Sequence, residues 1–302
     1  MTSAVSAAPG EAGAPSPWIA VMPVVFVILW STGFIVAKFG LPYAPPLTFL
    51  MLRFAGVSLV LLPLVLFMRA PWPTGRVADI ALSGVLLHAG YIGGVWCAIK
   101  LGMPAGLAAL IAGMQPVLTA FAAPMIGERV RPRQWVGLMC GLGGVALVVS
   151  NKISLIGLSY TSIALCTMGL LSITAGTLYQ KHRCAHFDLR TGTLIQYIAS
   201  ALVMLPLAIY VEHADLALSS VQWTPRFIGA LLWAIFVLSI GAVFLLFALI
   251  RKSAATSVTS LLYLTPPTTA LMAWAMFGEV FSLTGMAGMV LAVIGVAFVV
   301  KK

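Results

Sequence analysis

Polar and aromatic side chains inside long apolar stretches are the residues of this sequence that could bind a small molecule. His88, Tyr91 and Trp96 lie in one such stretch. At about 100° per residue along a helix, the three side chains fall within an arc of about 140° on one side of it. Polar residues in apolar surroundings usually line a ligand or ion pathway, and a histidine there can accept a proton. The pattern favours a shared cavity, and the alternative is a core histidine bonded to a neighbour.

A second set of aromatic and hydroxyl residues lies in other apolar stretches. We expect it to extend the candidate cavity, because ring faces suit a flat apolar molecule or a cationic or amino group. The alternative is packing, or anchoring at the membrane interface, where aromatic residues are common. The members of this set are Trp30, Ser172, Tyr179, Tyr263 and Trp274.

Prolines interrupt two apolar stretches at corresponding positions. Gln115 precedes Pro116, and Pro266 precedes Pro267, so the two pairs are 151 positions apart. Proline removes a helix hydrogen bond and clashes with the preceding turn, which predicts a kink with freed carbonyl groups. We expect Gln115 to line the cavity and the three prolines to act as gating hinges. Static kinks are the alternative.

Arg53 is the only basic residue well inside an apolar stretch. Its guanidinium group could bind the carboxylate of a ligand. The alternative is a structural or gate-lining role, in which it pairs with backbone carbonyls. The polar Gln196 at the corresponding position of the second half favours that alternative.

The elements that carry these residues are predicted to be transmembrane helices. The 302 residues are 61% hydrophobic and 8% charged, against roughly 25% charged in soluble domains, and the mean hydropathy is +1.08. A helix of about 20 apolar residues spans a bilayer. We therefore expect an all-α integral membrane protein with ten transmembrane helices and no soluble domain. The ten stretches cover about residues 18–39, 46–68, 77–99, 103–126, 133–150, 158–180, 189–211, 227–250, 254–277 and 284–300.

The sequence is internally duplicated. Residues 110–149 recur as residues 261–300, and the front of each half matches at an offset of 143 positions. Because five spans per half is an odd number, the halves must cross the membrane in opposite senses, as an inverted repeat. We predict a first repeat at residues 18–152 and a second at 153–302, preceded by a disordered cytoplasmic tail at residues 1–17.

Positive charge is unevenly distributed between the loops. With ten spans, both termini share a side with twelve Lys and Arg residues, and four lie on the other side. The positive-inside rule predicts cytoplasmic termini in a bacterial inner (plasma) membrane. In a soluble protein the net charge of +10 would suggest binding to nucleic acid. Here the basic residues lie between the spans, where they interact with anionic lipid and set the topology. The spacing of the four cysteines predicts no metal site, and we expect no cofactor.

Inverted repeats with broken helices are typical of alternating-access transporters, which bind substrate near the midplane. An enzyme acting within the membrane would need intramembrane acids, clustered histidines or a nucleophile motif, and the sequence has none. All seven acids lie in the tail, in loops or at span ends, whereas proton-coupled exporters commonly carry a buried carboxylate. We expect a facilitator, in which His88 is the obvious intramembrane proton acceptor.

Several motifs together resemble the drug/metabolite transporter superfamily, EamA type. They are Trp30-Ser31-Thr32-Gly33-Phe34 in the first span, Arg53 in the second, the duplicated proline, and Gly-Glu ending the fourth and ninth spans. The segment from His88 to Tyr91 is similar to the YddG-type exporters of aromatic amino acids and methyl viologen. The resemblance covers residues 18–302. It implies an inner-membrane exporter of aromatic amino acids and of planar cationic drugs such as methyl viologen.

Export of other neutral amino acids or metabolites, with proton coupling, is the alternative function. The expected partners are a small-molecule substrate and the lipid bilayer, without nucleic acid. The oligomeric state is open and a monomer is compatible with the sequence. Small-residue faces such as Gly137, Gly141 and Gly144 serve packing within one chain or between subunits.

Overall fold

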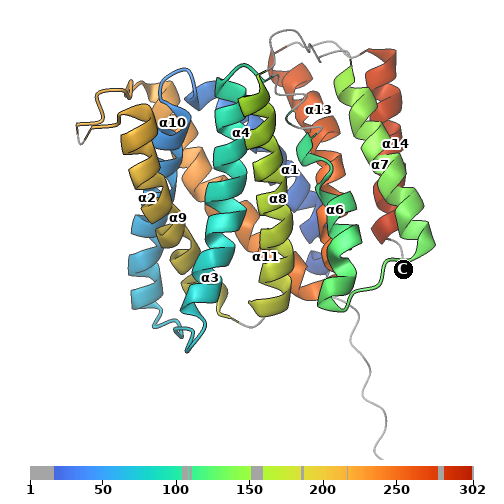
Figure 1. Ribbon diagram of the computed structural model, residues 1–302, viewed down its shortest axis with the longest axis horizontal. Coiled ribbons are helices and arrows are strands. Elements are labelled where there is room, and N and C mark those ends of the chain that lie inside the picture. Colours follow the sequence, from blue (N-terminus) through green and yellow to red (C-terminus); the bar gives the residue numbers. More distant parts are fainter. Residues whose placement is uncertain are drawn as a thin grey trace, which may run out of the picture.

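The computed structural model describes residues 17–103, 108, 111–150, 159–184, 187–215, 217–277 and 282–300, so the predicted tail lies almost wholly outside it. Within this part of the chain the regular elements are helices, without strands (Figure 1). Six described helical stretches are long and apolar enough to cross a membrane. The prediction of an all-helical, multi-pass membrane protein is confirmed, and that of ten crossings stays a prediction. The six stretches are Pro46–Phe67, Val77–Lys100, Tyr160–Arg183, Leu189–Glu212, Pro225–Arg251 and Leu283–Val300.

The predicted stretches coincide with single helices or with runs of consecutive helical segments, as far as the described residues extend. The first half contains α1 (Pro17–Gly40), α2 (Pro46–Phe67), α3 (Val77–Gly84), η1 (Val85–Gly90), α4 (Tyr91–Lys100), α6 (Gln115–Ala122), η2 (Ala123–Ile126) and α7 (Pro132–Ser150). The second half contains α8 (Tyr160–Arg183), α9 (Leu189–Glu212), α10 (Pro225–Trp233), η3 (Ala234–Ala242), α11 (Val243–Lys252), α12 (Ala255–Ser260), η4 (Leu261–Leu264), α13 (Thr265–Phe277) and α14 (Leu283–Val300).

Two of these runs contain π-helix at corresponding places. The π-helix η1 connects α3 to α4, and the π-helix η3 connects α10 to α11. The duplication aligns His88 of η1 with Ser239 of η3. A π-helix shifts backbone hydrogen bonds from the fourth to the fifth residue along the chain, and it is frequent at functional sites. Both halves therefore carry the same local irregularity in their third stretch.

The prolines expected to kink helices lie instead at the starts of helices. The helix α6 begins at Gln115, after a turn, with Pro116 in its first turn. The helix α13 begins at Thr265, directly after the 3-10 helix η4, with Pro266 and Pro267 in its first turn. Proline fits there because N–H groups of a first turn have no intrahelical acceptor. A new helical segment thus begins at these residues, and their role as gating hinges stays a prediction.

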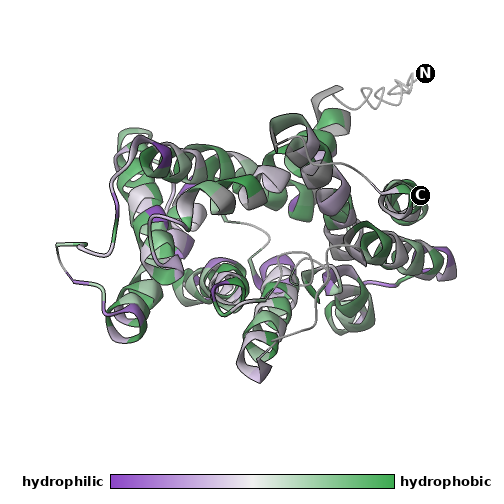
Figure 2. Ribbon diagram, turned by 90° about the horizontal axis from the view of Figure 1, so that it is seen from above, coloured by the Kyte–Doolittle hydropathy of each residue, from purple (hydrophilic) through white to green (hydrophobic). Residues whose placement is uncertain are grey.

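The two halves interleave. The helix α2 packs on α9 and α7 packs on α14, at opposite ends of the molecule, and hydrophobic residues prevail along the helices (Figures 1 and 2). The other contacts between halves are reciprocal. The third stretch of the first half contacts α8 and α9, and the third stretch of the second half contacts α1 and α2. Likewise α1 contacts α13, and α8 contacts α6. Reciprocal contacts of this kind are what a two-fold relation between the halves requires.

A carboxylate joins the ends of α2 and α9. Glu212, the last residue of α9, accepts hydrogen bonds from the backbone N–H groups of Leu47 and Thr48 and from the Thr48 hydroxyl, each at 2.8 Å. These backbone groups lie in the first turn of α2, where Pro45 at the N-cap provides no side-chain acceptor. Negative charge also suits the positive end of the helix dipole. Glu212 therefore fastens the second helix of one half to that of the other.

The helices α7 and α14 approach so closely that their backbones touch. A Cβ atom built on Gly137 would lie 2.6 Å from the carbonyl oxygen of Gly295, and one on Gly288 would lie 2.6 Å from the carbonyl oxygen of Gly144. Small residues permit this separation, which gives extensive van der Waals contact where lipid provides little hydrophobic driving force. The small-residue face predicted for α7 is therefore used within the chain.

We expect Gly144→Ala to destabilise the protein and Gly143→Ala to leave it intact. A Cβ at Gly144 would lie 2.4 Å from the backbone nitrogen of Ala292, whereas at Gly143 the nearest atom is Leu291 Cδ2 at 3.7 Å. Overpacking costs about 1–3 kcal/mol, and both changes gain a similar helix propensity of roughly 1 kcal/mol. The measurement is the thermal unfolding midpoint in detergent. Equal midpoints for the two variants would contradict the backbone contact.

Candidate functional site

A cavity lies where α1, α2, α4 and η3 meet. Aromatic rings from α1 and α4 form much of its wall, and Arg53 of α2 adds a guanidinium group. The structure thus brings together three residues predicted for a cavity, Trp30, Tyr91 and Trp96. The complete lining consists of Trp30, Gly33, Arg53, Tyr91, Ile92, Val95, Trp96 and Leu238.

The two tryptophans of the wall are held by aromatic packing. The ring of Trp30 lies 5.3 Å from that of Phe26, centroid to centroid, and the ring of Trp96 lies 5.3 Å from that of Phe49. Such tilted pairs stabilise ring orientation beyond the burial of area. The cavity therefore presents two positioned indole groups from different helices.

In this conformation the cavity is small, with a volume of about 70 Å³. A buried water needs about 10–15 Å³ on this measure, so the space suits a few water molecules. A ligand with an aromatic ring would require α1, α4 or η3 to move outward.

Arg53 makes the cavity electropositive. Its side chain is 5% exposed, and no ion pair joins it to a carboxylate of the described residues. Its Nε donates to the Ser239 hydroxyl oxygen of η3 at 2.8 Å, and its Cζ lies 5.9 Å from the ring centre of Phe54. The Tyr197 hydroxyl of α9 donates to the Ser239 carbonyl at 3.2 Å. Burial of an unpaired charge is costly, so this arrangement calls for an anion.

His88 is not among the residues that line this cavity. Its ring stacks on that of Tyr197, with centroids 4.4 Å apart and 14° between the planes. Phe54 and Phe247 lie 6.1 and 6.5 Å away, centroid to centroid. Its Nε2 is buried, and it has no hydrogen-bond partner among the described residues. His88 is thus part of an aromatic cluster that reaches the Arg53 network through Tyr197.

Two other predicted cavity residues bond to neighbouring helices. Gln115 of α6 donates from Nε2 to the Thr177 hydroxyl of α8 at 3.1 Å. Ser172 of α8 donates to the carbonyl oxygen of Leu86, within η1, at 2.9 Å. The Leu86 carbonyl also accepts the backbone N–H of Tyr91, so Ser172 adds a second hydrogen bond to it. In this conformation both side chains position α8.

The remaining predicted residues lie apart from the cavity lining. Tyr179 donates its hydroxyl to the carboxylate of Asp79. Tyr263 is fully buried against Gly141, and its hydroxyl has no hydrogen-bond partner among the described residues. Trp274 of α13 is 54% exposed. The structure therefore does not join these three side chains to Trp30, Tyr91 and Trp96, and their part in a substrate cavity stays a prediction.

Sequence reasoning did not place Ser239, Tyr197 or Leu238 at the site. One signal existed for Ser239, because the duplication aligns it with His88. Leu238 carried no signal, since it is one apolar residue in an apolar run. Tyr197 adjoins Gln196, the counterpart of Arg53, yet only the packing of α9 on α2 brings it to Ser239.

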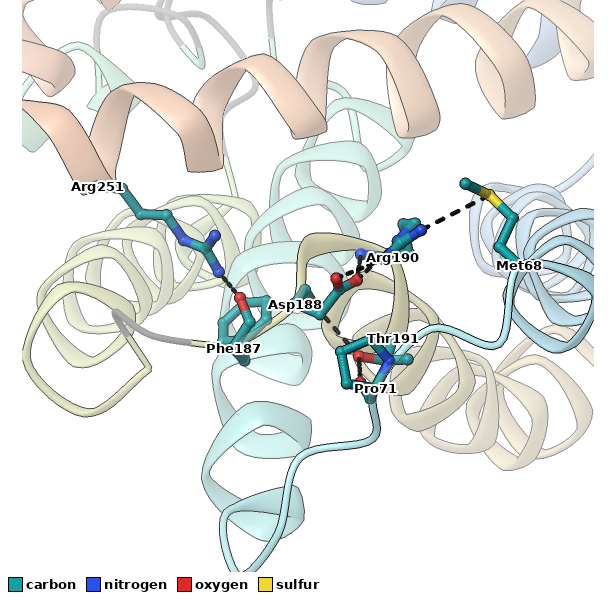
Figure 3. A network of polar contacts seen from close by, with 7 residues as sticks. All are labelled: Met68, Pro71, Phe187, Asp188, Arg190, Thr191 and Arg251. Atoms are coloured by element: carbon teal, nitrogen blue, oxygen red, sulfur yellow. Dashed lines mark hydrogen bonds and ion pairs between the residues drawn. The ribbon is translucent and has the colours of Figure 1, made fainter.

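A second polar network lies where the chain enters α9 (Figure 3). Asp188, the N-cap residue, accepts a hydrogen bond from the Arg190 backbone N–H at 2.9 Å. Its carboxylate also accepts from Nε of Arg190 at 3.0 Å and from Nη2 at 2.8 Å. These bonds to Arg190 hold the pKa of Asp188 below its usual range. Thr191 donates to the Pro71 carbonyl at 2.9 Å, which ties α9 to the segment that follows α2.

The same region secures the end of α11. Arg251 donates to the Phe187 carbonyl, and its Cζ lies 5.0 Å from the Phe187 ring centre. Lys181 of α8 donates from Nζ to the carbonyl oxygens of Ile250 and Ser253, each at 2.6 Å. Positive charge at a helix C-terminus complements both the dipole and the unbonded carbonyls. Basic residues of this region therefore complete the hydrogen bonding of a helix end.

The EamA-like transporter family matches the chain twice, at residues 17–150 and 160–301. The two matches together cover most of the sequence, and each covers one of the halves that the duplication defines. A solved crystal structure has a TM-score of 0.74 at 19% sequence identity, covering 93% of this chain and 96% of that one. That likeness shows a shared fold.

Three curated relatives match over most of their own length. The uncharacterized transporter YvbV of Bacillus subtilis is 28% identical over 300 residues, covering 95% of this chain and 93% of that protein. A probable amino-acid metabolite efflux pump of Salmonella typhimurium is 29% identical, covering 91% of this chain and 92% of that protein. The uncharacterized inner membrane transporter YedA of Escherichia coli is 27% identical, covering 84% of this chain and 81% of that protein.

We expect Asp188→Ala to lower stability at neutral pH, and Asp188→Asn to lower it less, because asparagine keeps an N-cap acceptor. Loss of such a cap costs about 0.5–2 kcal/mol. Because the folded-state pKa is depressed, the contribution of the carboxylate is present above the unfolded value of about 3.9 and is lost as pH falls through the folded value.

Thermal unfolding midpoints in detergent, measured from pH 7 to about pH 3, test this expectation. The difference in unfolding midpoint between wild type and Asp188→Asn should shrink as the pH falls. A gap that is constant over this range would show that the charge of Asp188 does not stabilise the fold.

Proposed function

Because the chain belongs to the EamA-like transporter family, we propose that this membrane transporter exports aromatic amino acids from the cytoplasm by alternating access, as a facilitator. The observation that carries the proposal is the cavity of Trp30, Tyr91 and Trp96 beside the buried Arg53. Ring faces suit an aromatic side chain, and a guanidinium group suits a carboxylate. An aromatic amino acid has both groups.

The relatives support amino acids as the substrate class. Proteins of Salmonella typhimurium and Escherichia coli that are 29% and 28% identical to this chain are named probable amino-acid metabolite efflux pumps. The wall of two indole rings and a phenol ring adds the preference for aromatic side chains. Other neutral amino acids or metabolites are the alternative substrates, since a small apolar side chain would meet the same wall.

Alternating access is supported by the matched irregularities of the two halves. The π-helices η1 and η3 correspond to each other, and so do the proline-containing starts of α6 and α13. The reciprocal contacts between the halves agree with an inverted repeat of five plus five spans. We propose that the proline-containing helix starts are hinges of gates on opposite membrane faces. With both termini cytoplasmic, as the loop charges predict, the chain resides in the inner membrane.

Transport without a coupled proton is supported by the lack of a suitable carboxylate. Among the described residues, the buried polar side chains include no aspartate or glutamate. An antiporter needs a group that exchanges a proton for substrate within the membrane. His88, with its unpartnered Nε2, is the described group nearest to that role, and it would carry the coupling in the alternative, proton-coupled mechanism.

We expect purified protein in liposomes to transport radiolabelled tryptophan and phenylalanine down their gradients, at rates that an imposed pH gradient leaves unchanged at clamped membrane potential. Replacement of a cavity wall residue, Trp96→Ala, should reduce the rate at least tenfold, a loss of about 1.4 kcal/mol in transition-state binding. Trp72→Ala, at a residue that is 50% exposed and does not line this cavity, is the matched control.

The same assay distinguishes the alternatives. Flux that requires a pH gradient and disappears in His88→Ala would replace the facilitator by a proton-coupled exporter. Flux of threonine without flux of tryptophan would replace aromatic amino acids by small neutral ones. Methyl viologen belongs in the panel as the planar cation that the family resemblance implies.

A further inference from the structure

We infer that Arg53 binds the carboxylate of the transported molecule, and that this carboxylate, rather than an amino group, is the charge that the site recognises. The inference rests on the proposed function, because it names the chemical class of its substrate. That class is aromatic carboxylates, with or without an α-amino group.

No carboxylate of the described residues pairs with Arg53. Arg53 is 95% shielded from solvent, and its partners are the hydroxyl groups of Ser239 and Tyr197 and the face of the Phe54 ring. A neutral hydroxyl or phenyl group is not an anion. A guanidinium group cannot lose its proton at physiological pH, so its charge persists in the cavity. An anionic ligand would supply the charge that the described residues do not.

The guanidinium group of Arg53 is held in place by hydrogen bonds to neighbouring helices. Its Nε donates to the Ser239 hydroxyl at 2.8 Å, which fixes one side of the planar group against η3. Arg53 also forms a side-chain hydrogen bond with Tyr197, and its guanidinium group has further N–H groups that can donate to a ligand. Two parallel N–H groups on one edge match the two oxygens of a carboxylate. Ser239 is thus a positioning residue, which orients Arg53 for a two-point contact.

The cavity wall offers little to the amino group of a substrate. The residues that line the cavity include no acid, so an ammonium group would find no ion-pair partner among them. It would also lie in the field of Arg53. Removal of the amino group should therefore leave binding largely intact, whereas removal of the carboxylate should weaken it. A dication such as methyl viologen would meet repulsion.

The rival explanation is that Arg53 only fastens α2 to η3 and never contacts a ligand. Variants of Arg53 would then change the stability of the protein, without changing which charged groups it accepts. The ratio of affinities for two ligands, measured on one variant, separates the two explanations. This ratio is insensitive to the fraction of protein that is folded.

The experiment is isothermal titration of the purified full-length protein in detergent with three indole compounds, tryptophan, indole-3-propionate and tryptamine. For the wild type we expect tryptophan and indole-3-propionate to bind with affinities within about tenfold of each other. Tryptamine should bind about 10- to 100-fold more weakly, which is the range of a lost charged hydrogen bond.

The variants are Arg53→Gln, Arg53→Lys and, as a control at an exposed basic residue, Arg226→Gln. Arg53→Gln should bind indole-3-propionate and tryptamine equally, so that the preference for a carboxylate disappears. Arg53→Lys should keep part of the preference, because it retains the charge and loses the planar edge. Arg226→Gln should keep the wild-type ratio.

The outcomes separate this inference from the proposed function. If tryptophan is transported but tryptamine binds as tightly as indole-3-propionate, the carboxylate site is wrong and the proposed function stands. If tryptophan is not transported, yet indole-3-propionate binds to the wild type and loses its advantage in Arg53→Gln, the carboxylate site stands and the proposed substrate is wrong. An unchanged ratio in Arg53→Gln would overturn the inference directly.

Discussion

Within a bilayer, backbone N–H and C=O groups find no water, and every interruption of a helix must be repaired by the protein itself. This chain interrupts its helices repeatedly and repairs them with side chains from neighbouring helices. Around η1, the hydroxyl groups of Ser172 and Ser200 donate to the carbonyl oxygens of Leu86 and Gly84, at 2.9 and 3.1 Å. At the start of α2, the Glu212 carboxylate does the same for free N–H groups. At η1 and at the start of α2, a neighbouring helix thus provides a partner for backbone groups.

The interleaving of the halves determines where those partners come from. Arg53 of α2 contacts Ser239 in the third stretch of the second half, and its counterpart Gln196 of α9 contacts Ser83 in the third stretch of the first half, at 2.8 and 2.7 Å. The second helix of each half therefore contacts the third stretch of the other half, through side chains of different chemistry. One copy carries a permanent charge beside a cavity, and the other carries a neutral amide in a packed interior. In both copies a polar residue of the second helix thus bonds to a serine in the third stretch of the other half, although Ser83 and Ser239 are not corresponding residues.

Much of this arrangement could be predicted from the sequence, because hydropathy and repetition are local properties of the chain. The helical stretches, the matched prolines and the grouping of Trp30, Tyr91 and Trp96 were all accessible in this way. The helix against which each helix face packs could not be predicted in this way. Helical periodicity places Trp274 on a stripe with Tyr263, but the former is half exposed and the latter fully buried. Which face meets another helix depends on contacts between distant segments, and one sequence does not contain that information.

The sequence separation of Arg53 and Ser239 also has a consequence for how the chain is made. The two residues are 186 positions apart, so a ribosome releases Arg53 into the membrane well before the serine that orients it has been synthesised. Until then, water or lipid headgroups have to solvate the guanidinium group. The helices α4 and α9, which also pack on α2, are synthesised before η3. The native surroundings of Arg53 are therefore completed last, when η3 has been synthesised.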